Sequence, residues 1–176
     1  PQAVSNLRLY GSWAQVSSDL DPDFNNPYQT VAYYDKTGSF NGNPQLSYPG
    51  DIVNPFINPQ QSVTKEVGLS AGLFSNRLNV DVTYYNIVDK NQIIDLPISL
   101  ASGFSSRKIN GNEYTTNGME ITVNTAPVQR KSFNWNVTAN WSRRVERLTS
   151  IYGNQDEFNN LAEGERADNY YATGWM

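Results

Sequence analysis

Residues 64–86 decide the fold, and they read TKEVGLSAGLFSNRLNVDVTYYN. Two runs within this stretch, Glu66 to Leu73 and Arg77 to Tyr84, alternate apolar and polar side chains. A period of two places the apolar members of each run on one face of a strand. These members are Val67, Leu69, Ala71 and Leu73 in the first run and Leu78, Val80, Val82 and Tyr84 in the second. Only Phe74, Ser75 and Asn76 separate the runs, so the stretch predicts an antiparallel hairpin with a short turn.

Three further strands are predicted outside this hairpin. Gly118 to Asn124 and Phe133 to Trp141 alternate clearly, and a short connection that contains Pro127 joins them as a second hairpin. Leu7 to Val16 is a looser strand, with Leu7, Leu9 and Trp13 on one side. The chain is therefore expected to be all-β, with about five antiparallel strands.

The connections between these strands alternate in length. The segments from Ser17 to Val63, from Tyr85 to Glu113 and from Arg143 to the end are long, whereas the two hairpin turns are short. Short periplasmic turns and long extracellular loops are typical of a transmembrane β-barrel of the outer membrane. A soluble β-sandwich also alternates apolar and polar residues, so the pattern alone leaves both folds open. Asn, Thr, Ser and Gly on the polar faces favour a crowded lumen over a solvated surface.

Composition excludes several classes of function. The chain has 176 residues, no Cys and no His, which removes disulfides, thiolate nucleophiles, Ser-His-Asp triads and Cys/His zinc sites. Its net charge of −4 provides no basic field for nucleic acid. The chain opens on Pro1 without a signal segment, and we expect it to be an internal piece of a longer protein.

Whole segments of the chain resemble the SusC/RagA-type TonB-dependent transporters of the bacterial outer membrane. LYGSWAQVSSD at residues 9–19 is similar to a barrel strand of that family, and residues 64–86 are similar to its next hairpin. Asn117, Gly118 and Glu120 stand for the family's Asn-x-Gly-x-Glu stretch, although here Asn117 directly precedes Gly118, and Phe133 to Trp141 resembles its Phe-x-Trp strand. Before residue 64 the family often has a Leu-Lys-Pro-Glu lead-in, where this chain has Asn-Pro-Gln-Gln at residues 58–61, which leaves the start of that strand open.

The resemblance implies an architecture and a function. Residues 1–176 would form a partial barrel domain, about five strands of a 22-stranded barrel in its C-terminal portion, with the plug domain elsewhere. The protein would import an oligosaccharide or peptide nutrient, and its partners would be TonB, a SusD-like surface lipoprotein and outer-membrane lipid. No cofactor and no enzymatic activity are implied. Two alternatives remain open at this point: a secreted carbohydrate-binding β-sandwich that uses exposed aromatics, and a structural porin-like barrel.

Two kinds of motif suggest sites, and neither is assigned one. Asp19, Asp21, Asp23 and Asn25 share the opening spacing of a calcium loop. Phe24 stands where that loop needs Gly and Thr30 where it needs a bidentate Glu, so we interpret the segment as a solvated turn and assign no metal. The glycosylation sequons at Asn136 and Asn140 lie inside a predicted strand and are discounted.

The strand alternation assigns the two faces of the sheet. The face toward lipid is expected to carry Leu69, Leu78, Val80, Ile121 and Val137. On the other face, Glu66, Asp81 and Glu120 are interpreted as isolated lumen carboxylates and not as a catalytic pair. Aromatic residues at the strand ends suit two girdles at the membrane interfaces; these are Tyr84, Tyr85, Tyr114 and Trp141 at the long-loop ends and Phe74 and Phe133 at the turn ends.

The long segment from Ser17 to Val63 is rich in aromatic residues. Its rings include Tyr33 and Tyr34, and its only basic residue is Lys36. Packing among neighbouring loops would account for such rings. A surface for a partner or substrate would account for them equally, because Tyr joins a flat apolar ring to a polar tip. Tyr33 and Tyr34 are the predicted contacts.

Overall fold

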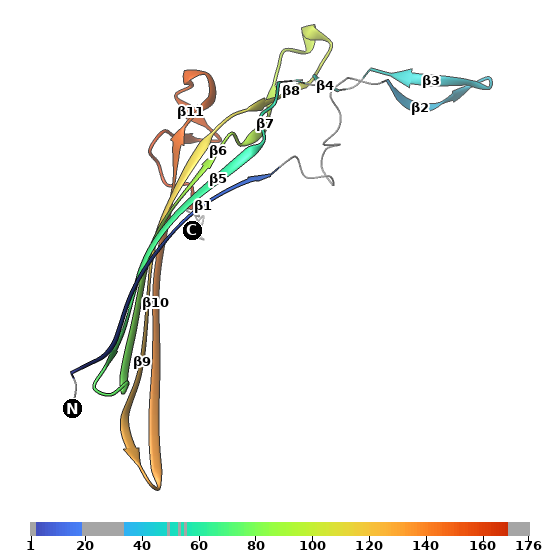
Figure 1. The fold of residues 1–176 in the computed structure, drawn as a ribbon. Helices are drawn as coiled ribbons and strands as arrows, with labels where there is room; N and C mark the ends of the chain where they lie inside the picture. Colours follow the sequence, from blue (N-terminus) through green and yellow to red (C-terminus); the bar gives the residue numbers. More distant parts are fainter. Residues whose placement is uncertain (1–2, 19–33, 49, 53, 55, 169–176) are drawn as a thin grey trace, which may run out of the picture.

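The computed structural model describes residues 3–18, 34–48, 50–52, 54 and 56–168. Five long strands form one antiparallel sheet in the order β1-β5-β6-β9-β10 (Figure 1). Their bounds are Val4–Ser18 for β1, Gln60–Leu73 for β5, Leu78–Lys90 for β6, Glu113–Arg130 for β9 and Phe133–Ser150 for β10. This sheet confirms the predicted all-β fold and both predicted hairpins. Within the described part of the chain, no helix is long and apolar enough to cross a membrane.

The register of the sheet places apolar residues in rows that run across all five strands. One row is Leu9, Leu69, Val82, Ile121 and Trp141, and the row below it is Leu7, Ala71, Val80, Val123 and Ala139. Leu78 and Val137 flank Thr125 in the next row down. The five residues assigned to the lipid face therefore share one face. Because a slip of one residue would move every apolar side chain to the opposite face, the alternation in the sequence specifies this register.

The two turns at the lower end of the sheet are short. Residues 74–77 join β5 to β6, and three consecutive residues there, Phe74, Ser75 and Asn76, have positive φ values of 52°, 59° and 61°. Residues 131–132 join β9 to β10. Pro127 lies inside β9 and not in the turn, which corrects the expected position of that connection. Here Ala126 and Pro127 lie opposite the single residue Asn136, and this is a β-bulge.

The strands continue further at the long-loop end than the sequence predicts. β6 runs to Lys90, β9 already begins at Glu113, and β10 runs to Ser150. The long segments between strands also contain small sheets of their own. These comprise the hairpin β2 (Asp35–Phe40) with β3 (Asn43–Ser47), the three-stranded sheet β4 (Asp51–Ile52), β8 (Ser106–Asn110) and β7 (Ile93–Pro97), and the pair β11 (Glu157–Phe158) with β12 (Leu161–Ala162).

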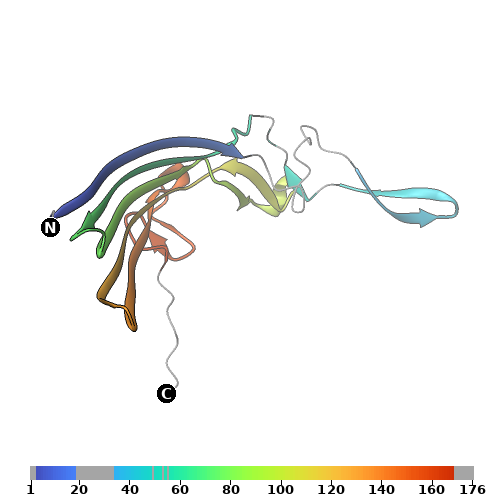
Figure 2. The same ribbon diagram turned by 60° about the horizontal axis from the view of Figure 1, so that its bottom comes forward.

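The hairpin β2–β3 extends well away from the large sheet (Figures 1 and 2). Its turn is formed by Asn41 and Gly42, with φ values of 53° and 79°. Positive φ at both central residues is the requirement of the tight hairpin turn that Asn-Gly favours. The local sequence therefore encodes this projecting hairpin.

Among the described residues, the few buried side chains lie where the long loops meet. They are Ile109, Leu148 and Ile151, together with the polar residues Asn112 and Thr116. Below this cluster the side chains of the long strands are half-buried or exposed. The described residues provide no second sheet against the apolar face, whereas a β-sandwich buries such a face against one.

Candidate functional site at the long-loop end

Tyr34 begins a chain of three aromatic rings at the base of the β2–β3 hairpin. Its ring meets that of Tyr48 edge to face, with centroids 5.2 Å apart, and Tyr48 meets Phe104 in the same manner at 5.3 Å. Tyr34 nevertheless remains 60% exposed. Of the two predicted contact residues, Tyr34 therefore lies on an accessible surface, while Tyr33 lies outside the described residues.

Backbone and hydroxyl contacts tie the same region to the second long loop. The carbonyl of Gly50 accepts hydrogen bonds from Ser105 N and from Ser105 Oγ, both at 2.8 Å. The Ser106 hydroxyl bonds to the Asp51 carboxylate, and β4 pairs in parallel with β8. The base of the projecting hairpin is thus fixed to the loop between β6 and β9.

Asn110 joins the two loops a second time. Its Oδ1 accepts from Asn58 N at 2.7 Å, and its Nδ2 donates to Asn58 O at 2.8 Å and to Asn91 O at 3.1 Å. One amide side chain therefore satisfies both backbone groups of a residue 52 positions away. Such paired bonds hold the loop backbone as a strand partner would.

Asn112 connects the third long loop to the two loops that Asn110 joins. It is fully buried, and its Oδ1 accepts from Tyr152 N at 3.3 Å. Leu148 and Ile151 pack nearby as buried residues. Further along, Arg166 donates two hydrogen bonds to the carboxylate of Asp168, which hold the pKa of Asp168 below its usual range. The three long segments therefore fold into one body above the sheet.

The three predicted lumen carboxylates share the polar face but lie in different rows. Asp81 is opposite Ser70 and Thr122, Glu120 is opposite Thr83, and Glu66 is opposite Tyr85. Glu66 and Asp81 are offset by four residues on neighbouring strands, about 13 Å at the usual rise of a strand. Over the residues that the structure describes, no group of three acidic side chains could hold a metal ion. This arrangement agrees with isolated carboxylates.

The calcium-like residues Asp19, Asp21, Asp23 and Asn25 lie outside the described residues, so that interpretation stays a prediction. Asn136 and Asn140 both lie within β10, as predicted for the two discounted sequons.

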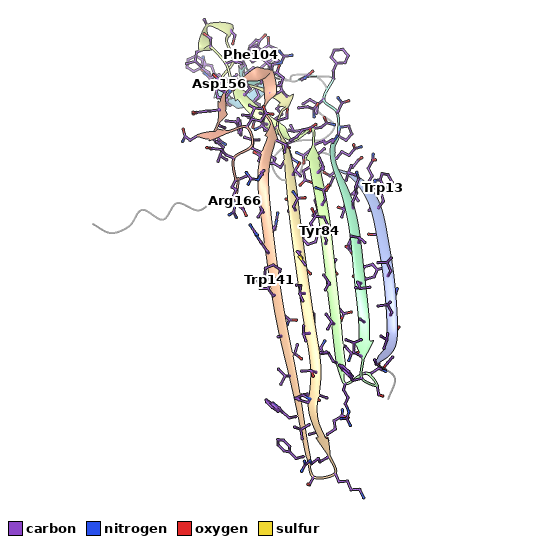
Figure 3. All side chains as sticks on the ribbon, turned by 90° about the vertical axis from the view of Figure 1, so that its left-hand side faces the viewer. Trp13, Tyr84, Phe104, Trp141, Asp156 and Arg166 are labelled. Carbon is purple, nitrogen blue, oxygen red and sulfur yellow. The ribbon has the colours of Figure 1, made fainter. Side chains whose placement is uncertain are left out.

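Of the four aromatic residues predicted for the girdle at the long-loop end, Tyr84 and Trp141 lie on the apolar face, and Tyr85 and Tyr114 do not. Trp13, Tyr84 and Trp141 lie on the apolar face, and each lies one row lower than the one before it, two strands away (Figure 3). In a barrel with tilted strands this stagger brings the three rings to one height. Tyr85 and Tyr114 belong to the opposite face, because Tyr85 follows Tyr84 directly and Tyr114 pairs with the lumen-facing Leu148.

Tyr85 and Tyr10 instead cover glycines of the polar face. A Cβ atom at Gly68 would collide with the Tyr10 ring, and one at Gly118 would collide with the Tyr85 ring. The Tyr10 hydroxyl lies 2.8 Å from Thr83 Oγ1 on the next strand. These rings lie flat on the wall, where an aromatic side chain compensates for the missing side chain of a glycine.

Three features together define the wall of a transmembrane β-barrel. They are an open antiparallel sheet with one apolar face, a tilted row of aromatic residues, and large loop structures at one end. A family model described as "TonB dependent receptor-like, beta-barrel" matches residues 2–174. The chain therefore belongs to the TonB-dependent receptor-like β-barrel family.

Relatives from Formosa agariphila agree with this assignment. The chain is 28% identical over 142 residues to TonB-dependent receptor P3, a match that covers 78% of this chain and 14% of the relative. It is 24% identical over 172 residues to TonB-dependent receptor P39, covering 96% of this chain and 16% of that relative. The chain thus spans less than a fifth of the length of these curated relatives.

Solved structures confirm the fold. The RagAB peptide transporter matches with a TM-score of 0.76 at 22% identity, over 93% of this chain and 18% of the other. The RagAB peptide importer in the "closed-closed" state matches with a TM-score of 0.78 at 23% identity and the same coverage. The resemblance to a SusC/RagA-type barrel is therefore confirmed at the level of the fold.

Proposed function

We propose that the chain forms part of the wall and outer mouth of a transporter in the bacterial outer membrane, which imports an oligomeric nutrient with energy supplied through TonB. The observation that supports this most strongly is the combination of a lipid-facing sheet with three long segments fastened into one body at its end. A passive porin-like barrel would need no such body, whereas a gated importer needs a structured mouth.

The proposed partner is a SusD-like surface lipoprotein, and the proposed contact surface is the β2–β3 hairpin with its base at Tyr34. On this hairpin Phe40 is 74% exposed and Leu46 is also exposed. An isolated two-stranded hairpin is marginally stable in water, so a hairpin that is encoded by its own turn and fixed at its base is suited to be covered by another molecule. The likeness of the fold to the RagAB peptide transporter supports a partner of this kind.

The proposed substrate is a peptide, with an oligosaccharide as the second candidate. The likeness to the RagAB peptide importer favours the peptide. The described strands have no role in catalysis under this proposal, because their lumen carboxylates stand apart from one another.

Uptake by cells that express the full-length parent protein tests this function. Labelled oligopeptides and labelled oligosaccharides would be supplied separately to cells with and without the parent gene and with and without TonB. We expect peptide uptake that requires both proteins. Uptake that persists without TonB would support a passive porin, and uptake restricted to oligosaccharides would replace the substrate class while leaving the transporter in place.

A further inference from the structure

The tip of the β9–β10 hairpin combines exposed aromatic rings with basic residues. Phe133 and Trp135 are 59% and 53% exposed, and Arg130 and Lys131 stand at the turn beside them. No Asp or Glu occurs between Ile121 and Val145. The tip therefore carries positive charge that no neighbouring carboxylate in these two strands offsets.

The bulge in β9 decides which way this tip faces. Above the bulge, Val123 and Thr125 are the β9 residues that share a face with Val137 and Ala139 of β10. Ala126 and Pro127 add one residue, so that Val128 pairs with Trp135 and Arg130 pairs with Phe133. Without the added residue, Val128 and Arg130 would point to the polar face, because successive strand residues alternate. The bulge thus turns Arg130 to the lipid side.

The heights of the residues fit the lower membrane interface. Trp141 belongs to the upper aromatic row, and Phe133 lies eight residues (141 − 133) further down the same strand face. Eight residues span about 27 Å along a strand, or about 20 Å along the axis of a barrel with tilted strands. The apolar band of such barrels is about 25 Å tall. Phe133 and Arg130 therefore stand at the lower boundary of the hydrocarbon, with Lys131 beyond it, and Figure 3 shows this hairpin reaching further than its neighbours.

We propose that the β9–β10 tip is a binding site for anionic phospholipid in the leaflet on the short-turn side. Trp135 and Phe133 lie against the part of the acyl chains nearest the headgroups, where a Trp ring with its polar N–H edge is favoured. Arg130 and Lys131 pair with the phosphate and the net negative charge of the headgroup. The occupant is a lipid and not a soluble acidic protein, because the cations follow directly on a lipid-facing apolar strip formed by Val128, Trp135 and Val137.

A photoreactive side chain at Ser132 tests this site in the full-length parent protein. Ser132 lies in the turn between Lys131 and Phe133. The protein would be placed in nanodiscs of phosphatidylethanolamine with a minority of phosphatidylglycerol and irradiated. The mass of each adduct would then identify the attached lipid. We expect phosphatidylglycerol adducts enriched at least about fivefold over the bulk lipid ratio. A photoreactive side chain at Asn41, the tip of the β2–β3 hairpin, should yield no such enrichment.

Matched charge variants separate a local site from general attraction. R130Q with K131Q should return the adducts to the bulk ratio, whereas R130K alone should retain the enrichment. K36Q with R107Q removes the same charge at the long-loop end and should change nothing. Barrel assembly in each variant is checked by the mobility shift of the folded protein on unheated gels. Adducts at the bulk lipid ratio in the parent, or adducts with a polypeptide, would overturn the proposal.

Discussion

The ring of Tyr10 lies over Gly68, its register partner on the neighbouring strand, so closely that a Cβ atom at residue 68 would collide with it. Tyr85 and Gly118 repeat the arrangement two strands further on. In both pairs the glycine is required by the ring and not by backbone torsion, since neither glycine is among those with positive φ. The two contacts hold β1 against β5 and β6 against β9 on the lumen side of the sheet.

Substituting Gly68 with Ala should therefore destabilise the barrel. Displacing the Tyr10 ring, and with it the contact to Thr83 Oγ1, should cost about 1–3 kcal/mol, the usual range for overpacking. The matched control is G11A, because a Cβ at residue 11 would meet only the carbonyl oxygen of Glu66 at an ordinary 3.5 Å. Equilibrium unfolding of the parent barrel in lipid vesicles measures both. Equal losses for the two variants would show that the ring contact contributes nothing specific.

The lipid face should reject a charge that the lumen face accepts. V80R places a guanidinium in the middle of the apolar rows and should cost about 2–4 kcal/mol, whereas N79R on the adjacent, lumen-facing position should cost far less. The same unfolding assay reports both values. If the two substitutions proved equally harmful, the assignment of inside and outside would be wrong.

Asn110 should control the coupling between the first two long loops. N110A leaves Asn58 N and Asn58 O without their partner, a loss of about 1–3 kcal/mol in local stability. Hydrogen exchange of the Asn58 amide should speed up accordingly. N54A is the control, since the Asn54 side chain bonds only to Phe56 N within its own loop. Unchanged exchange in N110A would mean that the β4–β8 pairing and the contacts of Tyr48, Gly50 and Asp51 hold the loops together without Asn110.

Replacement of Tyr33 and Tyr34 with Ser should weaken association with the lipoprotein partner or nutrient uptake while the barrel still assembles. Tyr34 is exposed at the base of the hairpin, so its loss removes contact area and leaves the long sheet untouched. Co-purification of the partner and uptake assays measure the effect. A double variant that keeps its partner and imports nutrient as the parent does would assign these tyrosines to loop packing.

The membrane part of the fold was predictable because its signal is local. Alternation from Glu66 to Leu73 and from Arg77 to Tyr84 reports directly that one face of each strand meets lipid. The same strands continue to Gln60 and Lys90, where alternation is lost. Beyond the hydrocarbon both faces of a strand can be polar, so the pattern stops at the membrane boundary while the hydrogen-bonded ladder continues.

The structure of the loops was harder to predict from the sequence. Asn41-Gly42 is a local signal that could have located the β2–β3 hairpin, since the pair favours a tight hairpin turn. No comparable signal marks Asn110, because its partner Asn58 is distant in sequence and becomes a neighbour only when two loops meet. The sequence predicts Pro127 in the connection between two strands, which is the commoner place for proline, because its place in a bulge depends on the register with β10.

The central claim, that this sheet is a barrel wall with its apolar rows in lipid, is tested most directly by single cysteines along β6. The chain has no native Cys, so Cys at positions 79–83 of a cysteine-free parent can be labelled one at a time in intact outer membranes. A water-soluble thiol reagent should modify positions 79, 81 and 83 and spare positions 80 and 82, while a lipid-dissolved reagent should show the opposite pattern. Uniform reactivity along the strand, or water-soluble labelling at positions 80 and 82, would contradict the account.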